Sequence, residues 1–142
     1  ILEALSHLHR FNIAHRDLKP ENVMVSRGYC VLVDFGFAKV IEGKSQTCCG
    51  TEEYMAPEII LGVGHNKAAD YWSFGILIYE MLVGRRPFES NDQPELFHRI
   101  CYVDYYFPVD VHVGDGASYL IEQLLVGNPS QRLGCLTGGV AD

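Results

Sequence analysis

The run Tyr71–Val83 constrains the fold of this chain more than any other feature, because as a helix it is apolar on nearly every side. A helix that is hydrophobic all round is stable only when other elements cover it, so the run predicts a buried helix. Gly84 and Pro87 end it. Its strongly apolar part, Tyr71–Tyr79, is far too short to span a bilayer. The run therefore predicts the core of a folded lobe and no membrane segment.

The remaining patterns predict a mainly α-helical lobe with one small β-hairpin. Helices are expected over residues 1–10, after a cap at Asn91 or Asp92, and after a cap at Asp115. Val23–Val25 and Tyr29–Val33 are expected to form a hairpin. Residues 37–55 are rich in Gly, Ser and Thr and are expected to form a long loop. On the helix after Asp115, the apolar residues, Leu120 among them, are expected to share one face. Asp34 follows the hairpin, where a strand end can hold a side chain rigidly at a cleft.

Composition and charge exclude several classes of protein. Of the 142 residues, 48% are hydrophobic and 20% are charged, which is the balance of a globular domain. The net charge of −7 argues against a surface that binds nucleic acid or an anionic membrane, because such surfaces need clustered Lys and Arg. The five cysteines are odd in number and lack a C-x-x-C spacing, which indicates reduced thiols in the cytoplasm.

Three separated motifs carry the candidate chemistry: His15–Asn22 (HRDLKPEN), Asp34–Gly36 (DFG) and Ala56–Glu58 (APE). Asp17 can accept a hydrogen bond from a substrate hydroxyl and then its proton. Lys19 offers a cation to a transferred phosphoryl group. Asn22 and Asp34 offer hard oxygen ligands, which suit Mg²⁺. The order of these motifs indicates phosphoryl transfer.

With these motifs the whole chain resembles the large, C-terminal lobe of a serine/threonine protein kinase of the AGC group. The most similar runs are Asp34–Lys39 (DFGFAK), Cys49–Thr51 (CGT) and Asn128–Gly134 (NPSQRLG), and Lys19 resembles serine/threonine rather than tyrosine kinases. Together, the runs Asp70–Leu77 (DYWSFGIL) and Asn128–Ser130 (NPS) are more similar to the cGMP-dependent kinase than to its cAMP-dependent relative.

The resemblance implies that ATP and Mg²⁺ are the cofactors and that the γ-phosphate goes to Ser or Thr in basic sequences. Catalysis would then involve Asp17, Lys19, Asn22 and Asp34, and the nucleotide would meet Glu21, Asn22, Met24 and Asp34. Asn22 and Asp34 would hold the metal. Cyclic-nucleotide regulation would depend on regions outside these residues.

The resemblance also assigns roles around the long loop. Thr47 lies where these kinases carry an activating phosphothreonine, and Arg16 and Lys39 would be its cationic partners. Thr51 resembles the hydroxyl that bridges the catalytic aspartate and lysine of serine/threonine kinases.

Further positions resemble substrate-recognition and structural sites. Glu21 and Glu80 fall where the group binds arginines that precede the acceptor residue. The pocket for the residue after the acceptor would involve Cys48, Thr51, Glu52 and Met55, and Glu52 stands where the group normally carries proline. Glu58 and Arg132 match a buried ion pair, and Asp70 matches the base of a stacked column with His15 and Phe35.

Residues 1–142 are thus expected to form a partial protein-kinase domain, without the small lobe, the last helix and the C-terminal tail. A truncated, non-catalytic module for substrate docking or interaction is the alternative. A pseudokinase is disfavoured, because Asp17, Asn22 and Asp34 are all intact.

Overall fold

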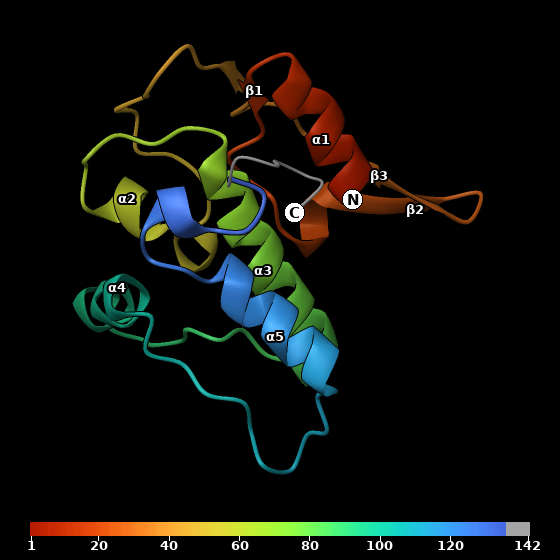
Figure 1. Ribbon diagram of the computed structural model, residues 1–142, viewed down its shortest axis with the longest axis vertical. Coiled ribbons are helices and arrows are strands. Elements are labelled where there is room, and N and C mark those ends of the chain that lie inside the picture. The colour runs from red at the N-terminus through yellow and green to blue at the C-terminus, as the bar shows by residue number, and fades with distance from the viewer. Residues whose placement is uncertain (136–142) are drawn as a thin grey trace.

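The computed structural model describes residues 1–135, and helix α3 (Ala68–Val83) runs through the middle of them (Figure 1). Trp72 and Ile76 are fully buried, so the central helix predicted from the apolar run is confirmed. The helix begins at Ala68, three residues before the apolar run that starts at Tyr71. Just before its first turn, the side-chain oxygen of Asn66 accepts a hydrogen bond from the N–H of Ala68 at 2.9 Å. Asp70 therefore lies inside the first turn of α3.

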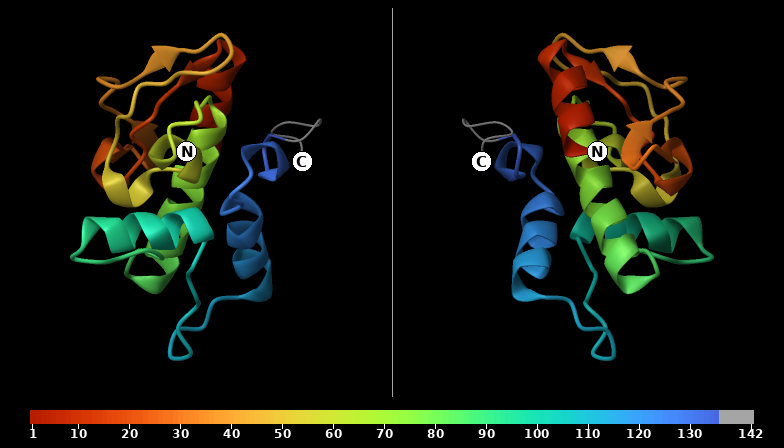
Figure 2. Two further views of the ribbon diagram at one scale, coloured as in Figure 1. Left: turned by 90° about the vertical axis from the view of Figure 1, so that its left-hand side faces the viewer. Right: turned by 90° about the vertical axis from the view of Figure 1, so that its right-hand side faces the viewer.

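Two sets of elements cover α3 from different sides. Figure 2 shows α5 (Asp115–Leu124) on one side of α3 and the orange and yellow segment around residues 20–55 on the other. Helices α3 and α5 approach closely at Gly75, where a Cβ would lie 2.9 Å from the side chains of Leu124 and Leu125. The core accordingly divides into one cluster around Trp72 and a smaller one around Leu5.

The N-terminal part of the chain contains helix α1 and two small antiparallel sheets. The elements are α1 (Leu2–Arg10), β1 (Ile13–Ala14), η1 (Pro20–Asn22), β2 (Val23–Ser26), β3 (Tyr29–Leu32) and β4 (Lys39–Val40). Strands β2 and β3 form the expected hairpin, with Val23 opposite Leu32, and it projects from the body of the lobe in Figure 1. Strand β1 pairs with β4, so the predicted loop over residues 37–55 contains a short strand that joins it to the segment before Asp17.

The second half of the described chain is helical. Its other elements are η2 (Glu52–Tyr54), α2 (Pro57–Ile60), α4 (Gln93–Tyr102) and η3 (Pro129–Gln131). Asp92 is the cap of α4, since its carboxylate accepts the N–H of Glu95 at 3.2 Å. The cap expected at Asp115 is wrong: Gly114 is the capping residue, and Asp115 is the first helical residue.

Leu120 differs from the expectation as well. It is 36% exposed, whereas Ile121 and Leu124 of α5 are buried. The buried stripe of α5 is therefore narrower than the sequence indicated. None of the described helices is long and apolar enough to cross a membrane. The terminal Gly138–Asp142 segment lies outside the described residues.

Candidate active site

The loop that carries Asp17 is held in place by hydrogen bonds to the buried carboxylate of Asp70. Asp70 accepts the backbone N–H of His15 at 2.9 Å and that of Arg16 at 2.8 Å, and it contacts Nε2 of His9 at 2.7 Å. Arg16 has a φ of 69°, a conformation that costs free energy in a non-glycine residue and persists only where its surroundings hold it. Asp70 thus fixes the backbone immediately before Asp17. The ring of His15 packs edge-on against Phe35, with 5.3 Å between the ring centres, so the three residues expected in one column are in contact through His15.

Asp17 is the centre of a hydrogen-bonded network. Its Oδ1 accepts the Thr51 hydroxyl at 2.8 Å and the Thr51 N–H at 3.0 Å. Its Oδ2 lies 3.1 Å from Nζ of Lys19, and Lys19 donates to the Thr51 hydroxyl oxygen at 2.8 Å. The Thr51 hydroxyl therefore bridges Asp17 and Lys19, as the sequence predicted.

This network determines the ionisation of Asp17. Burial alone would raise the pKa of Asp17, but hydrogen bonds from Thr51, Lys19 and Asn22 and the charge of Lys19 outweigh it and hold the pKa below its usual value. Asp17 is only 5% exposed. It is consequently an ionised, oriented hydrogen-bond acceptor at neutral pH.

The long loop approaches Asp17 through Gly50. The φ of Gly50 is 105°, and a Cβ on it would lie 2.6 Å from the carbonyl oxygen of Arg16. Thr47, three positions earlier, is exposed, and its N–H donates to the Ser45 hydroxyl at 3.4 Å. Within residues 1–135, no hydrogen bond joins the Thr47 side chain to Arg16 or Lys39. Arg16 donates through Nε to the carbonyl of Phe37 at 2.7 Å, and its buried Nη1 has no partner among the described atoms.

Two glutamates expected to bind substrate lie near Tyr54. The Tyr54 hydroxyl donates to a carboxylate oxygen of Glu80. Burial, followed by this hydrogen bond and by the charges of Glu80 and Glu21, raises the pKa of Tyr54 far above its usual value. Asp17 and Tyr54 line one small cavity. Glu80 therefore binds a tyrosine that lies beside the loop carrying Asp17, and the charge of Glu21 also acts on that tyrosine.

The residues expected around the position after the acceptor have different exposures. Cys48 is exposed, whereas Met55 is 7% exposed and belongs to the core cluster around Trp72. Glu52 is half-buried, and its carboxylate accepts the side-chain amide of Gln93 at 2.5 Å. The position that usually carries proline thus holds a carboxylate tied to the start of α4.

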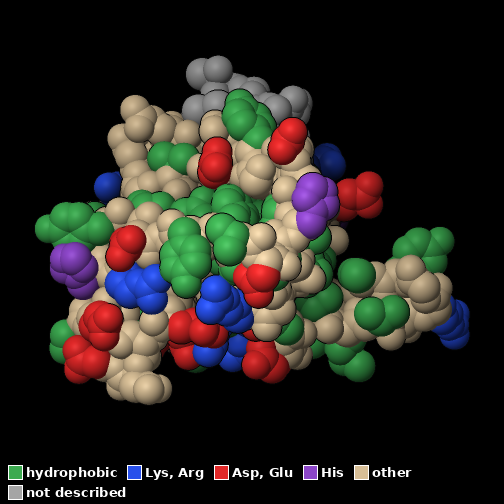
Figure 3. All heavy atoms as spheres, turned by 90° about the horizontal axis from the view of Figure 1, so that it is seen from below, with side chains coloured by type: hydrophobic (Ala, Val, Ile, Leu, Met, Phe, Trp, Pro, Cys, Tyr) green, Lys and Arg blue, Asp and Glu red, His purple; other side chains and the backbone are tan. Residues whose placement is uncertain are grey.

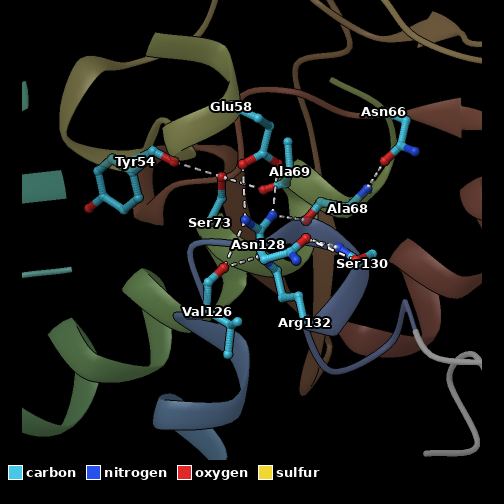
Figure 4. A network of polar contacts seen from close by, with 10 residues as sticks. All are labelled: Tyr54, Glu58, Asn66, Ala68, Ala69, Ser73, Val126, Asn128, Ser130 and Arg132. Atoms are coloured by element: carbon cyan, nitrogen blue, oxygen red, sulfur yellow. Dashed lines mark hydrogen bonds and ion pairs between the residues drawn. The ribbon is translucent and has the colours of Figure 1, made fainter. Parts of the chain in front are cut away.

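A buried ion pair joins α2 to the end of the described chain. Arg132 contacts both oxygens of Glu58, at 2.8 and 3.0 Å, and also donates to the carbonyls of Ala68 and Val126 (Figure 4). Its guanidinium lies 5.3 Å from the centre of the Trp72 ring. Because both side chains are buried, the ion pair expected from the sequence is present with its donors largely satisfied.

The comparisons with known proteins agree with this geometry. The family model described as "Protein kinase domain" matches residues 1–138. The chain belongs to the protein kinase family. It is 47% identical to the cGMP-dependent protein kinase egl-4 of Caenorhabditis elegans over 146 residues, which cover 100% of this chain and 19% of that protein. Similarity to the cyclic-nucleotide-dependent kinases, expected from the sequence, is confirmed.

Two further relatives show the same extent of match. Identity is 47% over 145 residues to the cGMP-dependent protein kinase, isozyme 1, of Drosophila melanogaster, with 100% of this chain and 19% of that protein covered. Identity is 46% over 143 residues to the cAMP-dependent protein kinase catalytic subunit of Dictyostelium discoideum, with 100% and 22% covered. The chain spans about a fifth of the length of these kinases.

The kinase cofactors Mg²⁺ and ATP are compatible with the oxygen atoms that this site presents. The Asn22 amide nitrogen donates to the backbone carbonyl of Asp17 at 2.8 Å and to its carboxylate at 3.0 Å. Because both acceptors are oxygens, the Asn22 side-chain oxygen points elsewhere and remains available to a cation. Asp34 is exposed, and one of its carboxylate oxygens accepts the N–H of Gly36 at 3.0 Å. Asn22 and Asp34 thus fit as ligands of Mg²⁺.

The nucleotide-facing residues expected from the kinase resemblance are accessible. Met24 of β2 is 57% exposed, and Glu21 of η1 is exposed too. Within residues 1–135 neither side chain makes a hydrogen bond that would hinder a contact, and both lie within two residues of Asn22. Their positions are consistent with the expected role.

Sequence reasoning missed two contacts around this kinase site. The ring of His9 contacts Asp70 and packs edge-on against Tyr71, with 4.9 Å between the ring centres. Arg86 forms an ion pair with Glu53 at 2.9 Å, and no spacing in the sequence joins these two positions. The position of His9, one helical turn after Leu5, indicates a buried side chain and could have suggested the contact with Asp70. No signal in the sequence indicates the contact between Arg86 and Glu53.

Proposed function

We propose that the full-length protein is a serine/threonine protein kinase that transfers the γ-phosphate of ATP to Ser or Thr in basic sequence contexts. The observation that carries this proposal is the Thr51 hydroxyl, which joins Asp17 and Lys19 at 2.8 Å each. An ionised carboxylate, a cation and a fixed hydroxyl bridge together form a preorganised site for a nucleophile and for the charge of a phosphoryl group. Bound ATP would supply the phosphoryl group, and Mg²⁺ would neutralise its negative charge.

The residues of the chain would then orient the acceptor. Asp17 accepts a hydrogen bond from the substrate hydroxyl, directs its oxygen, and takes up its proton as that oxygen forms its bond to the γ-phosphorus and the bond from that phosphorus to the departing ADP breaks. Lys19, held beside Asp17, stabilises negative charge on the transferred group. Asn22 keeps the Asp17 carboxylate in place through its amide nitrogen. Phosphate on Thr47 would bring a dianion next to Arg16 and Lys39.

Substrate preference would follow from the acidic residues near the site. Glu21 and Glu80 are the proposed partners of arginines that precede the acceptor, because paired carboxylates suit a guanidinium. The names of the relatives support regulation by a cyclic nucleotide, which we assign to regions outside residues 1–142. We also propose that residues 1–142 are the large lobe of the kinase domain and that the protein is cytoplasmic.

The test is Mg²⁺-dependent phosphate transfer from ATP to an arginine-rich serine peptide by the full-length protein. Asp17→Asn is the matched variant, because it keeps the size of the side chain and removes its charge. Transfer that is present in the wild type and lost in Asp17→Asn supports the proposal. Binding of the same peptide without any transfer by the wild type would favour the non-catalytic docking module.

A further inference from the structure

Three consecutive residues of η2 are each held by a different part of the lobe. Glu52 accepts a hydrogen bond from Gln93, Glu53 pairs with Arg86, and Tyr54 donates to Glu80. Because Thr51 precedes them directly and binds Asp17, these contacts lie beside the catalytic loop. Of the three, the contact with Arg86 introduces a cation.

Arg86 is bound by two carboxylates at once. Its Nη1 lies 2.9 Å from an oxygen of Glu53, and its Nε lies 3.4 Å from an oxygen of Glu89. The side chains are 32%, 30% and 45% exposed for Arg86, Glu53 and Glu89, so water reaches all of them. They line a surface hollow together with Ser90 and Asn91. The chain itself therefore shows what ligand these carboxylates accept, namely a guanidinium.

The Arg86 contact borders the residues that we assign to substrate recognition. The charges of Glu80, Glu21 and Arg86 all act on the Tyr54 hydroxyl, the first two raising its pKa and the third lowering it. Glu53 and Tyr54 are neighbours in η2. Figure 3 shows acidic and basic side chains gathered together on one edge of the face seen from below, next to an apolar area. Arg86 thus places a positive charge beside Glu53 and Glu89, next to the tyrosine that binds Glu80.

We propose that Arg86 is a specificity-determining residue, which occupies Glu53 and so removes one carboxylate from the surface that recognises basic substrates. This inference rests on the proposed function. In the wild-type protein, a substrate arginine that reaches Glu53 meets a carboxylate already paired with Arg86, so it adds little to the affinity for the substrate. Arginines that reach Glu21 and Glu80 meet carboxylates that no cation of the described residues neutralises, although Glu80 also accepts the Tyr54 hydroxyl.

The test compares full-length wild type, Arg86→Ala and Arg86→Lys on a set of serine peptides. One peptide carries the basic residues that suit Glu21 and Glu80, and each of the others has one additional arginine at a different position. Loss of Arg86 should lower KM for one or two of these extra-arginine peptides, relative to the parent peptide, by about two- to fivefold, the range typical of exposed ion pairs. Arg86→Lys, which keeps the cation, should resemble wild type.

A second substitution identifies the carboxylate responsible. In Arg86→Ala/Glu53→Gln the selective gain should disappear, because the released carboxylate is gone. An equal change of KM on every peptide, including one without arginine, would overturn the inference and assign Arg86 a purely structural role. A gain that survives Glu53→Gln would overturn it as well.

Fluorescence anisotropy of the labelled peptides keeps the inference separate from the proposed function. If the wild type transferred no phosphate, the proposed kinase activity would fail, yet selective tightening of one extra-arginine peptide by Arg86→Ala would still support the role of Arg86. Unchanged binding of every peptide would contradict that role whether or not phosphate is transferred.

Discussion

Gly50 lies against the main chain of Arg16, so close that a Cβ at position 50 would stand 2.6 Å from the Arg16 carbonyl oxygen. This approach joins the long loop to the catalytic loop. It brings the next residue, Thr51, within hydrogen-bond distance of Asp17 through both its N–H and its hydroxyl. The contact between Thr51 and the Asp17 carboxylate therefore depends on an approach that only a residue without a side chain permits.

Gly50→Ala is expected to lower kcat of the full-length protein by about a hundredfold, the typical effect of displacing a reacting group by 1 Å. The added methyl group must push the loop away from Arg16 and draw Thr51 away from Asp17. Steady-state kinetics with a serine peptide measure the effect. Gly43→Ala is the matched control, because Gly43 has a similar φ of 99° in the same loop but no atom within 4 Å of its Cβ position. Equal losses in both variants would show that backbone strain, not the contact, is responsible.

Whether a feature could be predicted from the sequence depends on how far apart in the chain the interacting residues lie. The central helix and the hairpin could be predicted from their apolar and β-rich runs, and the Asp17–Lys19–Thr51 bridge followed from the resemblance to serine/threonine kinases. The pairing of β1 with β4 could not, since strands of two residues show no period. The start of α5 differed from the prediction: Gly114 is the capping residue, no side chain caps the helix, and Asp115 is the first helical residue.

Other misses concern contacts between distant positions. Arg86 and Glu53 meet only because α3 returns the chain to η2, and nothing local in either segment indicates the pair. The contact of His9 with Asp70 spans α1 and α3 in the same way. The likeness to known kinases thus predicted the cluster of Asp17, Lys19 and Thr51 that the structure contains, whereas the charged contacts around it required the three-dimensional arrangement.

Thr51→Val should shift the pH dependence of activity. The Thr51 hydroxyl is one of the hydrogen-bond donors that lower the pKa of Asp17 despite its burial. Without the hydroxyl the pKa of Asp17 rises, and because the acceptor must be ionised, the acidic limb of the kcat/KM profile moves to higher pH. Thr51→Ser keeps the hydroxyl and should leave that limb near its wild-type position. An acidic limb that is the same in Thr51→Val and wild type would contradict this account of Asp17.

Removing one partner of the buried Glu58–Arg132 pair should destabilise the segment around α2. Arg132→Met leaves the carboxylate of Glu58 buried without its cation, which typically costs about 3–5 kcal/mol. Hydrogen exchange of the full-length protein, followed by mass spectrometry on peptides from α2 and the start of α3, reports the local free energy of opening. In Glu58→Gln/Arg132→Met neither charge remains, so protection should be partly restored. Protection lower than in Arg132→Met would contradict the role given to the stranded charge.

Glu80→Gln should selectively weaken the binding of arginine-containing peptides to the full-length protein. The substitution removes the negative charge that would face a substrate guanidinium, yet the glutamine carbonyl can still accept the hydrogen bond of Tyr54. The tether of η2 is therefore retained, and a loss of binding reports on charge rather than on the position of the loop. We expect KM for an arginine-containing serine peptide to rise by about tenfold, as for one charge-assisted hydrogen bond, and KM for a neutral peptide to stay close to wild type. Tyr54→Phe is the complementary variant, since it breaks the tether and keeps the charge. If the neutral peptide lost as much affinity as the basic one in Glu80→Gln, the carboxylate would position η2 and would not recognise arginine.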